Sequence, residues 1–341
     1  MPDFERLERL GAGHFGEVWL VQDHALNVQR AVKFVPVKSV TDPSDFYNEP
    51  RALMELRHEH IVRVEDAGRL NDGTLYVAME YLRHGSVEQV YRSAPIQLTK
   101  CIGLVKDVCW ALEYAHAREF IHRDIKPGNV LIDGNNRGKL SDFGLATKLS
   151  VDGTASPFGY RTHLAPEVVQ GGGMTKLSDQ YALGLTAYRM INGDAFLPEV
   201  TDSGELIDMI LAGTYPNRGR YRPYVPAKVQ RIVNRCMDVD PSKRFDSASE
   251  FRQALEGVLL HCDWTLRQKG SVVRYRARIG TAKYKVNITS MVGGRFSIET
   301  TKQIADGDVR RVKKDCFATL TLAEMKKAIR RVLQRYVANG S

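Results

Sequence analysis

The N-terminal part of the chain alternates short apolar runs with turns. Three of these runs have the length and composition of β-strands, namely Glu17 to Val21, Ala31 to Val35 and Leu75 to Tyr81. One helical stretch lies among them, around Arg51 to Arg57. The pattern therefore predicts a small sheet with one helix over residues 4 to 82.

Farther along the chain, the apolar residues change to helical spacing. They recur every three or four residues from Leu98 to Phe120 and again from Ser178 to Asn192, and further helical runs continue to about Leu260. We therefore expect a second, mostly α-helical lobe over residues 83 to 261.

The last part of the chain returns to strict alternation. From Val272 to Ile279, apolar side chains on one face alternate with arginines on the other, and the next run repeats this with lysines. A third candidate strand is Phe296 to Thr300. We expect the basic side chains of the first two runs to share one face of a sheet: Arg274, Arg276, Arg278, Lys283 and Lys285.

A helix should close this small β-meander. It opens with a capping box, in which Thr321 and Glu324 satisfy each other's backbone N–H groups. The spacing places five apolar residues inward, Leu322, Met325, Ile329, Leu333 and Tyr336. It places four basic residues outward, Lys326, Lys327, Arg330 and Arg331.

Charge divides the chain in the same way. Of the net charge of +9, residues 1–261 contribute −3, from 31 Lys and Arg against 34 Asp and Glu. Residues 262–341 contribute +12, from 18 against 6. One compact domain rarely segregates charge so completely, so we predict a boundary near residue 261. A hydrophobic fraction of 43% indicates globular domains rather than disorder.

The same composition argues against export. No window approaches the roughly 18 to 20 consecutive apolar residues that a membrane-spanning helix needs, and the first residues are not those of a signal peptide. The five cysteines lack disulfide or zinc-site spacing. We expect a cytoplasmic protein without a membrane span, disulfides or zinc.

The first chemical motif is glycine-rich, with Gly11, Gly13 and Gly16 at GxGxxG spacing. In dinucleotide-binding proteins this motif opens a helix, but here strand-like sequence continues through Val21. The context favours a β-hairpin over a polyphosphate, because glycines allow backbone N–H groups to approach phosphates closely. Lys33 follows in an apolar run, where a lysine needs an anionic partner. Nucleotide phosphates fit, with Glu49 to orient the ammonium.

Two further segments carry the most specific pattern, His122-Arg123-Asp124 with Asn129, and Asp142-Phe143-Gly144. Together with Ala165-Pro166-Glu167 and Arg244, they resemble the eukaryotic-type (Hanks-type) serine/threonine protein kinases over about Phe4 to Leu260. The resemblance implies an α+β bilobal fold, with a small β-sheet lobe and a larger helical lobe. We recognise no family for the C-terminal region.

The resemblance also implies roles for individual residues. Asp124 would be the catalytic base, Lys126 would contact the γ-phosphate of ATP, and Asn129 with Asp142 would hold magnesium. ATP would also be bound by the glycine-rich hairpin, by Lys33 oriented by Glu49, by apolar contacts to adenine, and by the segment that joins the lobes. The residues of these last two groups are Val18, Ala31, Leu131, Glu80 and Leu82. Glu167 and Arg244 would form a buried ion pair.

The resemblance also implies how the activity would be regulated. Arg123 resembles the arginine that binds a phosphorylated activation loop, and the candidate phosphosites are Thr154, Ser156 and Thr162. Two positions depart from the family pattern. Pro50 directly follows Glu49, and Tyr160 stands where a threonine is usual. The first bears on the Lys33–Glu49 pair and the second on peptide specificity.

We therefore interpret the chain as an ATP- and magnesium-dependent serine/threonine protein kinase that acts on protein substrates. A basic C-terminal module would localise or regulate it. The alternative is a pseudokinase or sensor scaffold whose basic tail binds nucleic acid. The basic rows of the tail have two interpretations, a solvated outer face of the sheet or a surface for an anionic partner. A net charge of +12 over the tail favours an anionic partner: a nucleic acid first, then an acidic protein or an anionic lipid surface.

Overall fold

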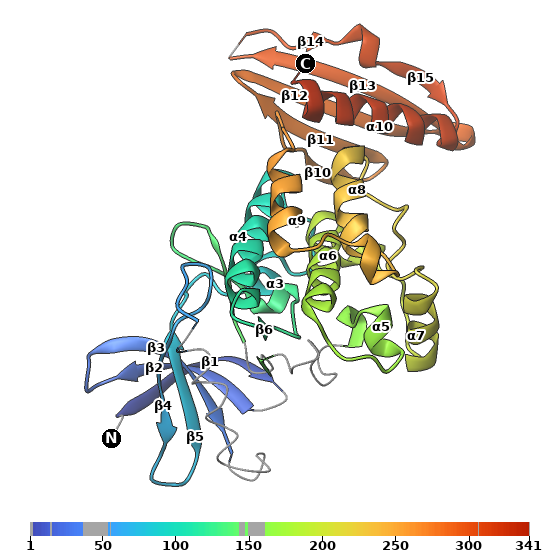
Figure 1. Cartoon of the computed structure of the whole chain (residues 1–341). Coiled ribbons are helices and arrows are strands. Elements are labelled where there is room, and N and C mark those ends of the chain that lie inside the picture. Colours follow the sequence, from blue (N-terminus) through green and yellow to red (C-terminus); the bar gives the residue numbers. More distant parts are fainter. Residues whose placement is uncertain are drawn as a thin grey trace.

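The computed structural model shows three parts in chain order, a β-sheet lobe, a helical lobe and a C-terminal module (Figure 1). It describes residues 3–13, 16–36, 54, 56–142, 147–148, 161–305 and 307–340. The predicted α+β architecture, with two lobes followed by a small sheet-and-helix unit, is confirmed.

The N-terminal lobe is a five-stranded antiparallel sheet in the order β1-β2-β3-β5-β4. Its strands are β1 (Phe4–Gly13), β2 (Gly16–Asp23), β3 (Val28–Val35), β4 (Val64–Arg69) and β5 (Leu75–Glu80). β1 and β4 were not predicted from the hydrophobic pattern. The helix expected around Arg51 to Arg57 lies mostly outside the described residues.

The helical lobe is built around α6, which is buried along most of its length. Its helices are α3 (Val87–Tyr91), α4 (Leu98–His116), α5 (Pro166–Val169), α6 (Lys176–Asn192), α7 (Ser203–Leu211), α8 (Ala227–Cys236) and α9 (Ala248–Glu256). Short 3-10 turns are η2 (Pro127–Asn129), η4 (Arg161–His163), η5 (Asp194–Phe196) and η6 (Pro241–Lys243). No helix in the described ranges is both long and apolar enough to cross a bilayer.

Two small pairs of strands in this lobe carry the candidate site. They are β6 (Phe120–Ile121) with β9 (Thr147–Lys148), and β7 (Val130–Ile132) with β8 (Gly138–Leu140). The prediction that a helix extends to Phe120 is wrong in its last residues. The chain leaves α4 at His116 because Phe120 is buried as part of a strand pair.

The C-terminal module is a meander of five strands in the order β10-β11-β12-β13-β14, and β15 also pairs with β13. The elements are β10 (Thr265–Lys269), β11 (Val272–Ile279), β12 (Ala282–Met291), β13 (Arg295–Ile304), β14 (Arg310–Arg311), β15 (Phe317–Leu320) and α10 (Leu322–Asn339). Two 3-10 turns complete it, η7 (Val292–Gly294) and η8 (Lys313–Asp315). The meander, the closing helix and its capping box are confirmed, whereas β10, β14 and β15 were not predicted.

The prediction that Leu322 points inward is wrong, since this side chain is 48% exposed. Leu322 is the first residue of α10, one turn ahead of the stripe that packs on the sheet. That stripe includes the predicted Ile329, Leu333 and Tyr336, and Tyr336 packs against Tyr284 with a ring-centroid distance of 4.8 Å.

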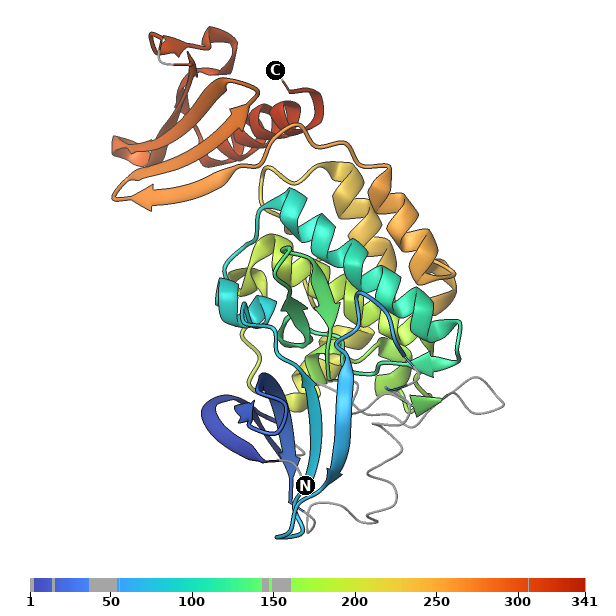
Figure 2. The same cartoon turned by 90° about the vertical axis from the view of Figure 1, so that its left-hand side faces the viewer.

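The module rests on the helical lobe (Figure 2). Trp264 is 3% exposed and belongs to a continuous apolar core that spans both parts. Gln334 of α10 donates a 2.7 Å hydrogen bond to the Val225 carbonyl, and Tyr275 of β11 lies edge-on to Tyr224. The segment from the end of α9 at Glu256 to Thr265 joins the two parts, so the boundary near residue 261 stays a prediction.

Candidate active site

The glycine-rich motif forms the predicted hairpin between β1 and β2. Gly13 pairs with Gly16 and Gly11 pairs with Val18, and no helix follows. Gly16 has a φ of +146°, and a Cβ at this position would lie 2.1 Å from the Phe34 carbonyl oxygen. Only glycine fits there, because the hairpin passes directly against the backbone of β3.

Lys33 lies in the middle of the sheet, paired with Val18 of β2 and Val77 of β5. Its side chain is 12% exposed, and its Nζ lies 3.2 Å from the Asp142 carboxylate. Packing around Asp142 opposes its ionisation, but the Lys33 ammonium outweighs it and holds the pKa of Asp142 below its ordinary value. The sequence predicted both residues as site residues but not this contact. Glu49, the predicted partner of Lys33, lies outside the described residues.

The loop before β7 brings together the predicted catalytic residues. Lys126 Nζ lies 2.7 Å from Asp124 Oδ2, and Asn129 Nδ2 donates to the same oxygen at 3.0 Å. Asn129 Nδ2 also donates to the Asp124 backbone carbonyl at 2.8 Å. The loop therefore presents one carboxylate, one ammonium and one amide within a few ångströms.

Asp179, near the start of α6, anchors the loop that carries Asp124. Its carboxylate is about 1% exposed and accepts the backbone N–H groups of His122 and Arg123 at 2.8 and 2.9 Å. It also lies 2.9 Å from His116 Nε2. Burial raises the pKa of Asp179, but the contact with His116 more than offsets this, so the pKa is lowered overall. These contacts of Asp179 were not predicted from the sequence.

His122 connects this loop to the end of β8. Its Nδ1 accepts the Asp124 backbone N–H at 3.2 Å, so the proton sits on Nε2, which donates to the Ser141 carbonyl at 3.0 Å. Burial lowers the pKa of His122, which favours this neutral form. The ring therefore fixes Asp124 relative to Asp142, the residue after Ser141.

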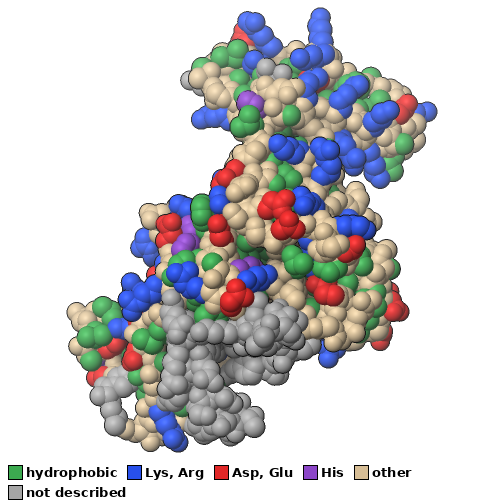
Figure 3. Space-filling model, viewed as in Figure 1, with side chains coloured by type: hydrophobic (Ala, Val, Ile, Leu, Met, Phe, Trp, Pro, Cys, Tyr) green, Lys and Arg blue, Asp and Glu red, His purple; other side chains and the backbone are tan. Residues whose placement is uncertain are grey.

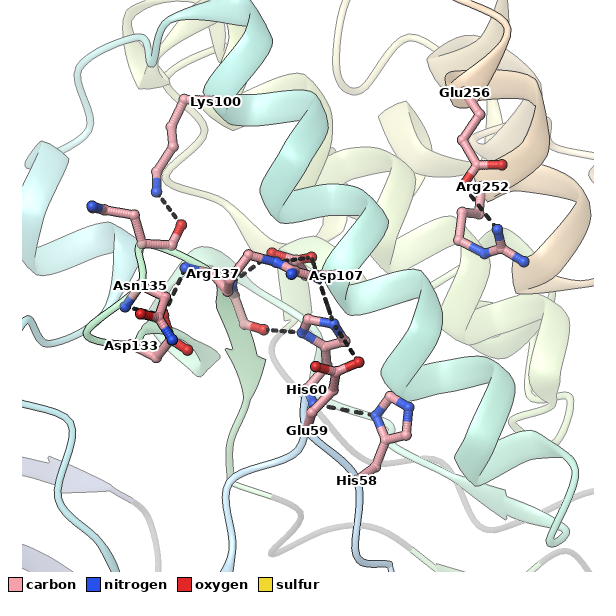
Figure 4. Close-up of polar contacts among 12 residues, drawn as sticks. His58, Glu59, His60, Lys100, Asp107, Asp133, Asn135, Arg137, Arg252 and Glu256 are labelled. Carbon is pink, nitrogen blue, oxygen red and sulfur yellow. Dashed lines mark hydrogen bonds and ion pairs between the residues drawn. The ribbon is translucent and has the colours of Figure 1, made fainter.

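A second polar network anchors the start of β8 to α4 (Figure 4). Asp107 of α4 accepts the Gly138 backbone N–H at 2.7 Å and Arg137 Nε at 2.9 Å. Arg137 has only donors, so its 2.9 Å contact with His60 makes Nε2 of that ring the acceptor. The other ring nitrogen, Nδ1, then donates to the Gly138 carbonyl at 2.8 Å. Nothing in the sequence motifs pointed to this network.

The predicted adenine contacts lie near the junction of the lobes. Val18, Ala31 and Leu131 are each partly exposed, on β2, β3 and β7. Glu80 ends β5, and its carboxylate lies 2.7 Å from Lys139 Nζ and accepts the Arg63 N–H. The Leu82 carbonyl accepts the Gly85 N–H in a turn. Adenine binding by these residues stays a prediction.

The predicted Glu167–Arg244 ion pair is confirmed. Both guanidinium Nη atoms lie 2.7 Å from the two carboxylate oxygens, and the Arg244 side chain is fully buried. Such a bidentate pair fixes the direction of the segment that enters α5. Of the predicted phosphosites, Thr162 lies in η4 with its Oγ1 3.0 Å from His163 Nδ1. Thr154 and Ser156 fall outside the described residues, as does Tyr160.

The donor set at the site fits a hard divalent cation. Asn129 uses its amide nitrogen for both bonds to Asp124, which leaves its Oδ1 to coordinate a metal. The Asn129 backbone is fixed to β8 because its carbonyl accepts the Ser141 N–H at 2.8 Å, and Asp142 follows directly. Amide and carboxylate oxygens are ligands that magnesium prefers.

Comparisons with known proteins agree with this geometry. The family model described as "Protein kinase domain" matches residues 4–256. The chain is 32% identical over 268 residues to "Serine/threonine-protein kinase PknJ" of Mycobacterium tuberculosis, with 74% of this chain and 45% of that protein aligned. It is 31% identical over 255 residues to "Serine/threonine-protein kinase PrkC" of Bacillus subtilis, with 72% and 39% aligned. The chain thus spans less than half the length of these relatives.

Asp179→Asn should destabilise the fold by about 1.5–3 kcal/mol, because the buried N–H groups of His122 and Arg123 lose a charged acceptor. Circular dichroism during urea unfolding measures the change as a lower midpoint. Asp208→Asn, an exposed carboxylate on α7, is the matched control and should change stability by less than about 0.5 kcal/mol. Equal midpoints for the two variants would contradict the anchoring role of Asp179.

Proposed function

The chain belongs to the protein kinase family, and from this premise we propose that it transfers the γ-phosphoryl group of ATP to serine and threonine hydroxyls of protein substrates. The observation that supports this most directly is the convergence of five polar residues from distant parts of the chain: Lys33, Asp124, Lys126, Asn129 and Asp142.

In the proposed reaction, the substrate hydroxyl oxygen attacks the γ-phosphorus of ATP, and the bond to the β–γ bridging oxygen breaks. Asp124 accepts the hydroxyl proton, and Lys126, 2.7 Å from Asp124, neutralises negative charge on the transferring group. Lys33 is placed to bind the other phosphates.

We propose magnesium as the metal, held by Asn129 and Asp142. When bound, it would supply positive charge that neutralises the phosphates. The lowered pKa of Asp142 keeps its carboxylate ionised at neutral pH, as metal binding requires. The other residues that we propose to bind ATP are Gly11, Gly13, Gly16, Val18, Ala31, Glu49, Glu80, Leu82 and Leu131.

Activation by autophosphorylation is a further proposal. Arg123 directly precedes Asp124, is partly buried and has a φ of +70°. Its backbone N–H donates to the Asp179 carboxylate, which fixes the backbone at this position. A phosphate in the segment before Ala165 would form charge-assisted hydrogen bonds with this guanidinium. The candidate acceptors are Thr154, Ser156 and Thr162.

The test of the proposed reaction is transfer of label from γ-labelled ATP, with magnesium, to a generic protein substrate. Asp124→Asn removes the proton acceptor and Lys33→Met removes a phosphate contact, so each should lower the rate of transfer by about 10²–10⁴-fold. The melting temperature measured without ATP should stay close to that of the wild-type chain. Asp208→Asn should keep the wild-type rate. Wild-type turnover by Asp124→Asn would overturn the mechanism. Binding of ATP by the wild-type chain without transfer would favour the scaffold alternative.

Incubation of the wild-type chain with ATP and magnesium should place phosphate on Thr154, Ser156 or Thr162, as peptide mapping by mass spectrometry would detect. A Thr154→Ala/Ser156→Ala double variant should then show a lower initial rate of substrate phosphorylation, because Arg123 lacks its phosphate partner. Ser290→Ala, an exposed serine of the module, is the control. An undiminished rate in the double variant would count against activation through these two residues.

A further inference from the structure

The sheet of the C-terminal module has one covered and one uncovered face. α10 packs on the face that carries Tyr275, Tyr284 and Val286. The opposite face of β11 and β12 carries the predicted basic residues, and four of them are exposed: Arg276, Arg278, Lys283 and Lys285. Figure 3, in which α10 lies on the near side of the sheet, shows mostly Lys and Arg among the charged side chains of the module, whereas both charge signs are mixed over the helical lobe.

Strand register arranges these four cations in a regular array, which we call the basic face. Arg276 pairs directly with Lys285, and Arg278 pairs with Lys283. Alternate residues on one strand are about 6.7 Å apart, and neighbouring strands are about 4.8 Å apart. The array can therefore contact several phosphates at once.

The charge of this array is not neutralised within the described part of the chain. No ion pair joins a described carboxylate to Arg276, Arg278, Lys283 or Lys285. Glu299, on the same face of β13, instead lies 3.2 Å from Arg311. Four unneutralised cations on a rigid sheet favour an external anion.

A groove of about 660 Å³ adjoins these residues, and all four cations of the basic face line it. It lies where β10 begins, since Thr265, the first residue of β10, pairs with Arg276, and β11 continues beyond that pair. Its other wall belongs to the start of α4, where Asp263 accepts the Thr99 backbone N–H at 3.0 Å. The helical lobe thus lines part of the groove beside the cations.

The composition of this face discriminates between partners. Protein interfaces have apolar, aromatic-rich centres that are depleted in lysine. Single-stranded nucleic acids are usually held by exposed aromatic rings that stack on bases. The described strand residues on this side of β10 to β13 include no aromatic side chain. Tyr284 also lines the groove, but it is 4% exposed and packs against Tyr336 of α10. The face is therefore suited to phosphates rather than to stacked bases.

We propose that the basic face and its groove bind the sugar–phosphate backbone of duplex nucleic acid without reading its sequence. The guanidinium and ammonium groups release condensed counterions when they contact phosphates, and this drives binding. The four cations lie beyond residues 4–256, which match the kinase family model, so this is a second function of the chain and does not depend on phosphoryl transfer.

The experiment is fluorescence anisotropy with the full chain and a labelled duplex of mixed sequence, at salt concentrations between about 50 and 200 mM. We expect binding that weakens steeply with salt and is similar for two unrelated sequences. The Arg276→Ala/Lys285→Ala variant should bind on the order of tenfold more weakly, and its slope of log K against log salt should be shallower by about two units.

The matched control is Lys326→Ala/Lys327→Ala, which removes the same charge from the exposed side of α10. It should bind like wild type, and circular dichroism should show both variants folded. Three results would overturn the proposal: no binding by the wild-type chain at low salt, equal loss in both variants, or binding of poly-glutamate but not of duplex. The last result would indicate an acidic protein partner.

Discussion

A buried carboxylate, that of Asp179, is the constraint on which the candidate active site depends. A buried charge in the core of the helical lobe is costly unless hydrogen bonds or ion pairs compensate it. Here two backbone N–H groups donate to the Asp179 carboxylate, and His116 contacts it. These donors belong to the loop that carries Asp124 and to the end of α4. The geometry of the loop therefore follows from the need to keep one buried charge paired.

Further polar contacts link this loop to the rest of the site. His122 couples the loop to Ser141, while Asp107, Arg137 and His60 hold the other end of the same hairpin. Asp142 then reaches Lys33, from the other lobe, across 109 residues of sequence. The two lobes thus present one array of charges.

The sequence predicted the parts of this site that depend on local spacing. The hairpin at Gly11 to Gly16 follows from strand-like residues after the glycines, and the basic face of the module follows from a period of two. The contacts between distant residues could not be predicted in this way. The Lys33–Asp142 pair, the His60 network and the early end of α4 depend on which surfaces meet in space. Leu322 fits the helical period but begins α10 ahead of the packed stripe.

We propose that these charged residues bind a metal–nucleotide complex for phosphoryl transfer. A crystal structure of the chain with manganese and a non-hydrolysable ATP analogue tests this most directly, because anomalous scattering locates the metal independently of the protein. We expect manganese bound by Asn129 Oδ1 and the Asp142 carboxylate, with the γ-phosphate facing Asp124 and Lys126. Manganese bound elsewhere, or a nucleotide that does not reach these residues, would contradict it.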